Sequence, residues 1–107
     1  MADIVVEGGE ETVRMIKGSG GEATFVKCDV SKAADVEALV KAAVDTYGRL
    51  ACANNIAGIK GLMAPTADYA ETDWDKVISI NLKGVWLSMK YEIPQIRSAR
   101  PLDARRL

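Results

Sequence analysis

The 107-residue sequence contains no histidine and only two cysteines, Cys28 and Cys52. Without histidine, the chain can form no His-based triad and has no imidazole to act as a general base. Two cysteines without a CxxC pair supply at most two soft ligands, so we expect no zinc site and no other metal site. Both cysteines lie in apolar, strand-like runs, which favours buried thiols over a disulfide or a nucleophile.

The chain also lacks a strong charge of either sign and any long apolar run. Its formal net charge of −1 gives no electrostatic reason to expect nucleic acid or an anionic membrane as a partner. The apolar runs are too short to cross a bilayer, and Met1 is followed by Asp3 and Glu7 rather than by a secretory signal. We therefore expect a cytoplasmic protein without nucleic-acid, membrane or metal partners.

The patterns that are present alternate between strand and helix. An apolar stub at 3–6 precedes a helix-compatible segment at 10–17, and residues 23–30 form a nearly continuous β-favouring run. An apolar face at helical spacing covers 36–47, and a short continuous apolar run begins the predicted strand 50–55. This alternation predicts βαβ units and a parallel sheet in an α/β fold.

Capping residues mark where the helices begin and end. Ser31 and Gly48 are the predicted start and end of the second helix, and Thr72 is the predicted N-cap of a longer one. Apolar residues form two stripes along 73–93, so we expect that helix to be covered by its own sheet on one side and by a partner on the other. Pro94 should kink or end it, because proline removes a backbone donor.

Residues 18–23 fit the dinucleotide-binding pattern G-x-G-x-x-A. That motif must follow a strand and open a helix, so that the helix N-terminus meets the pyrophosphate. Here the pattern follows a predicted helix and precedes a predicted strand. We therefore interpret it as a connecting turn.

Four segments occur together in order: MAD at 1–3, KCDVS at 27–31, RLACANNIAGI at 49–59 and INLKGVW at 80–86. With the helices between them, they make residues 1 to about 96 resemble an internal slice of the short-chain dehydrogenase/reductase family. The resemblance implies an incomplete Rossmann-like three-layer α/β fold, a βαβ unit with few parallel strands plus a long helix. It divides the chain into a partial Rossmann-like domain, 1–96, and an Arg-rich tail, 97–107, which we expect to be disordered or frayed.

The resemblance places two acids at the adenosine side of a nicotinamide dinucleotide. Asp3 falls where the family ends its second strand; a carboxylate there would accept from the ribose hydroxyls and repel the 2′-phosphate of NADP, which favours NAD. Asp29 and Val30 resemble the family's adenine-contacting pair. The alternatives are a surface acid near the terminus for Asp3 and a simple turn acid ahead of Ser31 for Asp29.

Two asparagine positions also carry the resemblance. Asn55-Ile56-Ala57-Gly58 resembles the family's Asn-Asn-Ala-Gly motif, with Ile56 in place of the second amide. Small residues at Ala57 and Gly58 would let the backbone approach the cofactor ribose, and Asn55 could bond the cofactor or a neighbouring strand. Asn81 counts onto the buried face of the long helix. The resemblance makes it the catalytic proton-relay Asn, and the alternative is a core Asn bonded to backbone.

The family's Tyr-x-x-x-Lys pair is not found in these 107 residues, because none of the three tyrosines is followed by lysine four residues later. The family's glycine-rich loop is not found in them either. We therefore expect a truncated relative of NAD(P)-dependent alcohol and ketone oxidoreductases that is inactive alone and binds NAD weakly or not at all. The alternative is a non-catalytic oligomerisation or interaction module built on the helix 73–93. An active site rebuilt from other residues has no candidate nucleophile–base pair.

The family's strand order, 3-2-1-4, raises a question of pairing. Two strands should lie between residues 23–30 and 50–55, and only a stub of one is present. Neighbouring strands lie roughly 4.8 Å apart, so that arrangement leaves a gap of about 10 Å. Three outcomes are open: direct pairing of the two segments as a βαβ unit, strands supplied by another chain, or partial order. We expect a homo-oligomer or a strand-complemented assembly over a stable monomer.

Overall fold

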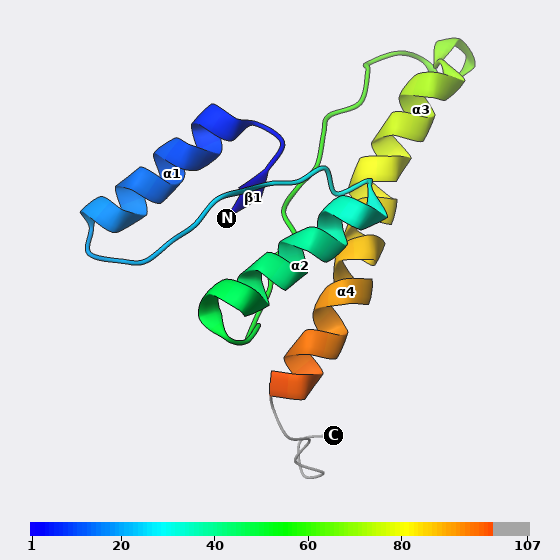
Figure 1. Ribbon diagram of the computed structural model, residues 1–107. Helices are drawn as coiled ribbons and strands as arrows, with labels where there is room; N and C mark the ends of the chain where they lie inside the picture. Colours follow the sequence, from blue (N-terminus) through cyan, green and yellow to red (C-terminus); the bar gives the residue numbers. More distant parts are fainter. Residues whose placement is uncertain (100–107) are drawn as a thin grey trace.

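The computed structural model describes residues 1–99 (Figure 1). Within residues 1–99 the chain forms two very short strands and four α-helices, with a 3₁₀ turn before α3 and a π-helical turn between α3 and α4. In order, the elements are β1 (Ala2–Asp3), α1 (Val6–Gly18), β2 (Val26–Lys27), α2 (Ala33–Tyr47), the 3₁₀ turn (Thr66–Asp68), α3 (Glu71–Ile78), the π turn (Ser79–Lys83) and α4 (Gly84–Ala99).

The two strands form a parallel pair connected by α1, which makes a βαβ unit. Ala2 lies opposite Val26 and Asp3 opposite Lys27. The backbone N–H of Cys28 donates to the carbonyl of Asp3 at 3.1 Å, so the pairing continues just beyond the strand. This arrangement, with the long helix that follows, confirms the predicted α/β class with few parallel strands.

The predicted strand at 50–55 does not form. Among the described residues, no backbone–backbone hydrogen bond involves residues 49–64, and the partner of β2 is β1. Direct pairing of 23–30 with 50–55 is therefore wrong. A strand is defined by the neighbour that accepts and donates its hydrogen bonds, and a continuous apolar run supplies no such neighbour.

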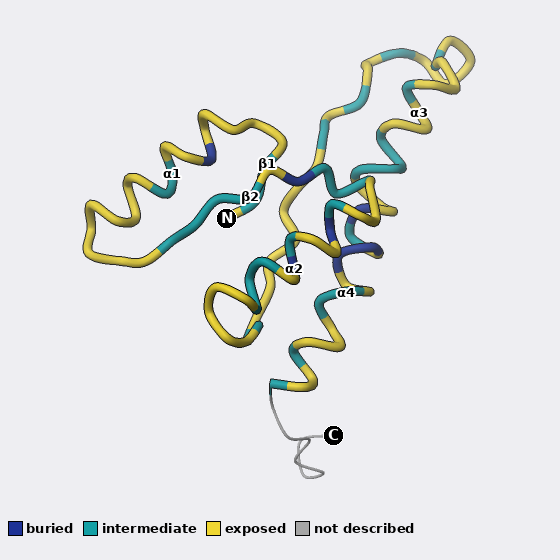
Figure 2. The backbone as a smooth tube through the Cα atoms, in the orientation of Figure 1, coloured by how far each residue is buried: buried dark blue, intermediate teal, exposed yellow. Residues whose placement is uncertain are grey.

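The buried core is small and lies where the end of β2 meets α2 and α4 (Figure 2). Cys28 directly follows β2, Val36 lies in α2 and Leu87 in α4, and all three are almost fully buried. Four partly buried residues pack around them, namely Ala2, Val30, Leu39 and Tyr91. Cys28 therefore confirms one of the two predicted buried thiols. Cys52 is exposed, because its segment has no second layer over it.

The end of α2 follows its sequence signal, whereas two helix starts do not. Gly48 ends α2 in the left-handed conformation with φ of 84°, which glycine adopts at little cost. Neither Ser31 nor Thr72 is an N-cap: the capping positions are Lys32 and Ala70, without a side-chain cap hydrogen bond. The Ser31 hydroxyl donates instead to the Asp29 carboxylate at 2.6 Å, because a charged acceptor competes well for it.

The linker between α1 and β2 is a turn, as predicted for residues 18–23. Helix α1 ends at Gly18, and Gly20 has a φ of 89°, in the left-handed region. Because the glycine-rich stretch follows a helix, it presents no helix N-terminus to a phosphate.

The long helical segment continues further than the sequence suggests. Pro94 lies inside α4, which continues to Ala99, so the proline does not end the helix. Residues 97–99 of the predicted Arg-rich tail are therefore helical, and residues 100–107 lie outside the described residues. Among residues 1–99, no helix has the length and apolar character needed to span a membrane.

Candidate functional site

Two acidic residues lie at the same edge of the parallel pair. Asp3 ends β1, and Asp29 follows β2 by two residues, so both lie at the carboxyl ends of their strands. Asp3 is half-buried, and its Oδ1 accepts a hydrogen bond from the backbone N–H of Val5 at 3.0 Å. In open α/β sheets, ligands bind outside the carboxyl ends of the strands. This edge is therefore where the predicted adenosine contacts belong.

Asp29 is held by the turn that leads into α2. Its Oδ1 accepts hydrogen bonds from both the hydroxyl and the backbone N–H of Ser31, at 2.6 and 3.0 Å, while its own N–H donates to Asp35 Oδ2 at 3.0 Å. The Ser31 hydroxyl, followed by the Ser31 N–H, lowers the pKa of the Asp29 carboxyl below its usual value. A lowered native pKa stabilises the fold above the unfolded value of about 3.9, and that contribution is lost as the pH falls through the native pKa.

Val30, three residues beyond β2, packs against the first turn of α4. A Cβ added at Gly84, which is buried, would lie 2.7 Å from Val30 Cγ2 and 3.4 Å from the Val30 carbonyl oxygen. Only glycine lets the two backbones approach this closely. The predicted adenine-side pair, Asp29 and Val30, is thus fixed to α4 by packing.

Asn81 lies in the middle of the π turn and contacts the coil that follows α2. Its Oδ1 accepts from the backbone N–H of Ile59 at 2.8 Å, and its Nδ2 donates to the Ile59 carbonyl at 2.9 Å. These contacts match the backbone-bonded alternative. The predicted burial is wrong, because Asn81 is exposed. The face counted from Trp74 is not the buried face, because Trp74 is itself 55 % exposed, and the π turn, which adds a residue to one turn, shifts the count further.

The Asn55–Gly58 motif lies in the unpaired coil. Asn55 Nδ2 donates to Glu92 Oε2 on α4 at 3.0 Å. Ile56 is 77 % exposed, and Ala57 and Gly58 are also exposed. A Cβ at Gly58 would lie 3.3 Å from Asn81 Oδ1, so the glycine leaves room for the Asn81 side chain. The structure thus attaches this coil to one helical segment at two separate points, Asn55 at Glu92 and Gly58–Ile59 at Asn81.

The segment that follows β2 and the two asparagines, Asn55 and Asn81, are all supported by the π turn and α4. Val30 contacts this helical segment at Gly84, Asn81 belongs to it, and Asn55 reaches it at Glu92. No hydrogen bond joins Asp3 or Asp29 to Asn55 or Asn81 within residues 1–99. The sequence interpretation missed Glu92 and Asp35, since an acid on an ordinary helix surface carries no signal of a distant partner.

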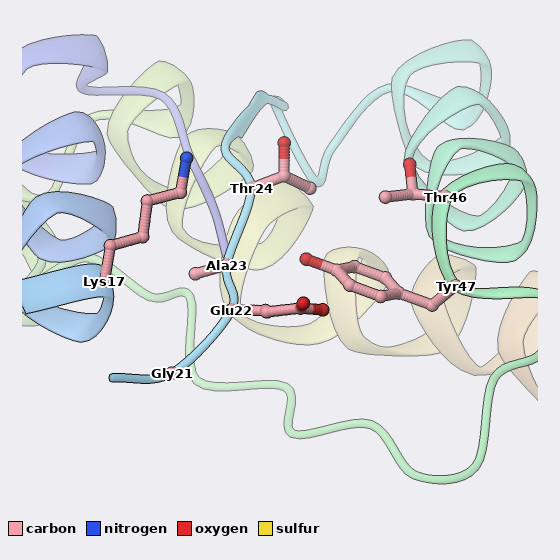
Figure 3. A pocket seen from close by; sticks show the side chains of 7 residues that line it. All are labelled: Lys17, Gly21, Glu22, Ala23, Thr24, Thr46 and Tyr47. Carbon is pink, nitrogen blue, oxygen red and sulfur yellow. The ribbon is translucent and has the colours of Figure 1, made fainter. Parts of the chain in front are cut away.

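A hollow of about 440 Å³ lies at the opposite end of β2 (Figure 3). It is lined by residues of the α1–β2 linker and the ends of α1 and α2, namely Lys17, Gly21, Glu22, Ala23, Thr24, Thr46 and Tyr47. None of the predicted site residues lines it. In residues 1–99, no group of three or more Cys, Asp or Glu side chains is placed to hold a metal ion.

The sequence of the chain matches a known family and known oxidoreductases. A family profile described as enoyl-(acyl carrier protein) reductase matches residues 1–101. An uncharacterized oxidoreductase of Thermotoga maritima is 44 % identical over 98 residues, 89 % of this chain and 37 % of that protein. Cyclohexanol dehydrogenase of an Acinetobacter species is 37 % identical over 99 residues, 92 % of this chain and 39 % of that protein.

Solved structures of related proteins share the fold of this chain. Levodione reductase matches with a TM-score of 0.88 at 34 % identity, over 92 % of this chain and 39 % of that one. Xylitol dehydrogenase with NAD⁺ matches with a TM-score of 0.88 at 28 % identity, over 92 % of this chain and 38 % of that one. Actinorhodin polyketide ketoreductase with NADPH matches with a TM-score of 0.84 at 33 % identity, over 92 % of this chain and 37 % of that one.

The chain spans about two fifths of the length of these relatives. By name those relatives are dehydrogenases, reductases and an uncharacterized oxidoreductase, and the xylitol dehydrogenase and ketoreductase structures hold NAD⁺ and NADPH respectively. Because the family profile covers most of the sequence and the structural matches share its fold, the chain belongs to the short-chain dehydrogenase/reductase family.

Proposed function

We propose that this chain binds the adenosine half of a nicotinamide dinucleotide and does not transfer hydride on its own. The observation that carries the proposal is the position of Asp3 and Asp29, two acids at the carboxyl ends of adjacent parallel strands. Each carboxylate uses one oxygen in a local hydrogen bond, and the described hydrogen bonds leave its Oδ2 without a donor. These oxygens fit the hydroxyl and amino donors of adenosine.

The described residues fit only that half of a dinucleotide. The one glycine-rich turn follows a helix, so it offers no helix N-terminus to the pyrophosphate. The sequence contains no tyrosine with lysine four residues later to protonate a substrate oxygen. When bound, the cofactor would supply hydride-transfer chemistry, and Asp3 and Asp29 would only hold and orient its adenosine end.

A nucleotide titration followed by NMR tests the proposal. We expect NAD and AMP to shift the backbone amide resonances of Asp3, Asp29 and their neighbours, because both ligands carry adenosine. Asp29→Asn should weaken binding, while Asp68→Asn, at an exposed acid of the 3₁₀ turn, should not. Millimolar NAD that leaves these resonances unmoved would refute the proposal.

The charge of Asp3 makes the preference for NAD testable. Two unit charges about 4 Å apart in water interact by about 1 kcal/mol, which corresponds to roughly a fivefold difference in affinity. We expect NAD to bind about fivefold more tightly than NADP, and Asp3→Asn to abolish the difference. Equal affinities in the unmodified chain would contradict this assignment.

A second candidate function is self-association through α4. Leu82, Trp86, Met89 and Ile93 are 64, 53, 41 and 47 % exposed. Trp86, Met89 and Ile93 recur at spacings of three and four residues, which puts them on one face of α4, and Leu82 precedes them in the π turn. The radius of gyration is 16.6 Å, against about 13 Å for a compact chain of this length. We propose a second copy of the chain as the partner that covers this face.

Sedimentation velocity at increasing concentration tests this candidate. We expect a dimer that the double change Trp86→Ala and Met89→Ala disrupts, because truncation removes the largest side chains of the face. Trp74→Ala, at an exposed tryptophan on α3, is the matched control and should leave the dimer intact. A monomer at several hundred micromolar would exclude a homodimer of useful affinity.

A strand-complemented assembly is the other form of partner. Met1 and Asp3 direct their carbonyls to β2, so the N–H and C=O of Ala2 point to the opposite edge. Residues 49–58 are also without a backbone partner among the described residues. We propose that a parallel strand from another polypeptide pairs with this edge. The assembly should then slow amide exchange at Ala2, and dilution should reverse it.

A further inference from the structure

A side-chain contact joins the unpaired coil to the middle of α4. Asn55 Nδ2 donates to Glu92 Oε2 at 3.0 Å, although the two residues are 37 positions apart in the sequence. Asn55 is exposed, and Glu92 is half-buried on the helix. Neither the fold class nor the sequence motifs call for an acid at this place.

The chemistry of the pair fixes the orientation of the Asn55 amide. An ionised carboxylate can only accept hydrogen bonds, so the NH₂ group of Asn55 must face Glu92. The carbonyl oxygen of the same amide then points away from the carboxylate. A neutral partner at position 92 would allow both orientations, because a side-chain amide both donates and accepts.

A second contact makes this one mechanically important. Asn81 bonds the backbone of Ile59, so the coil is attached to the helical segment at residues 55 and 59. Residue 55 contacts position 92 and residue 59 contacts position 81, so the coil between the two attachments runs antiparallel to the helical segment. Loss of the Glu92 contact releases one end of it.

We propose that Glu92 is a positioning residue of the nucleotide site: it holds Asn55 with the amide oxygen turned away from α4, as an acceptor for a hydroxyl group of the dinucleotide. This role rests on the proposed function, since it requires that the chain binds NAD. Glu92 itself touches no ligand in this arrangement. It acts by fixing the orientation of Asn55 and the path of residues 55–59.

The first test needs no ligand. We expect Glu92→Ala to shift the side-chain NH₂ resonances of Asn55 and to speed amide exchange at Ile59, whose N–H is bonded to Asn81 at the other end of the coil, by about two- to tenfold, the range for one lost hydrogen bond. Glu92→Gln should retain a contact but broaden or double those resonances, because both amide orientations become possible. Glu10→Gln removes an exposed carboxylate on α1 and should change neither. Asn55 resonances that ignore Glu92→Ala overturn the proposal.

The second test uses NAD as the probe. Glu92→Ala and Asn55→Ala should each weaken NAD binding by about two- to tenfold, and the double variant should be no weaker than either alone. Additive losses, or an unchanged affinity in Glu92→Ala, overturn the positioning role while leaving adenosine binding in place. An unmodified chain whose resonances do not respond to NAD overturns the proposed function, and the positioning role with it. The two failures are thus distinguishable.

Discussion

The paired hydrogen bonds between Asn81 and Ile59 give the sharpest quantitative prediction. The Asn81 amide accepts at 2.8 Å and donates at 2.9 Å, so Asn81→Ala removes both bonds at once. Each bond contributes roughly 0.5–1.5 kcal/mol, and exposure to water favours the lower end of that range. We therefore expect a local loss of about 1–2 kcal/mol, equivalent to a factor of about 5–30 in the opening equilibrium.

Amide hydrogen exchange of Ile59 measures this loss directly, because the only acceptor for its N–H in the described hydrogen bonds is Asn81 Oδ1. The exchange rate should rise by about 5–30-fold in Asn81→Ala. Asn81→Asp should give a smaller increase, since a carboxylate still accepts from the N–H but faces the Ile59 carbonyl without a proton to donate. Asn54→Ala is the control, an exposed amide one residue before the motif.

Two outcomes would refute this reasoning. Ile59 exchange at the rate of an unprotected amide in the unmodified chain would show that the contact does not persist in solution. Equal protection in the unmodified chain and in Asn81→Ala would show that something else holds the coil. A change at Ile59 with no change at the amides of α2 would support a local role for the contact.

Further predictions concern the α1 packing and the two thiols. Gly9→Ala should destabilise the βαβ unit, because a Cβ there would overlap the ring of Phe25. Gly8→Ala should be neutral or gain about 1 kcal/mol of helix stability, and thermal unfolding of the two variants compares them. Ellman's reagent should modify exposed Cys52 at once and buried Cys28 only as the chain opens. Burial, then nearby aspartates, raises the pKa of the Cys28 thiol, so stability should fall above about pH 8.5, where the unfolded thiol ionises first; urea unfolding at pH 7 and 9.5 checks this.

The sequence predicts best where the signal is local. Gly48 ends α2 because a left-handed C-cap depends on one residue and its neighbours. The glycine-rich turn after α1 is a connector for the same reason. The placement of Asp3 and Asp29 at one edge follows from parallel pairing, although their proposed role in binding is still a prediction.

The failures share a dependence on distant partners. The run at 50–55 has strand chemistry but no neighbour to pair with, and Cys52 within it is exposed for the same reason. Ser31 prefers the charged oxygen of Asp29 to the helix it was expected to cap. The partner of Asn55, Glu92, lies 37 residues away, and no local pattern indicates such a contact.

The π turn at Ser79–Lys83 has a consequence for how the helical segment tolerates insertions and deletions. One residue more than an α-helical turn amounts to about 100° of rotation, so α3 and α4 differ in angular phase by that amount. Deleting a single residue from the turn would leave composition and hydropathy almost unchanged. It would nevertheless rotate Leu87 out of the core and the exposed Trp86 face to a new direction relative to α3. In this segment, residue count therefore specifies geometry as firmly as residue type.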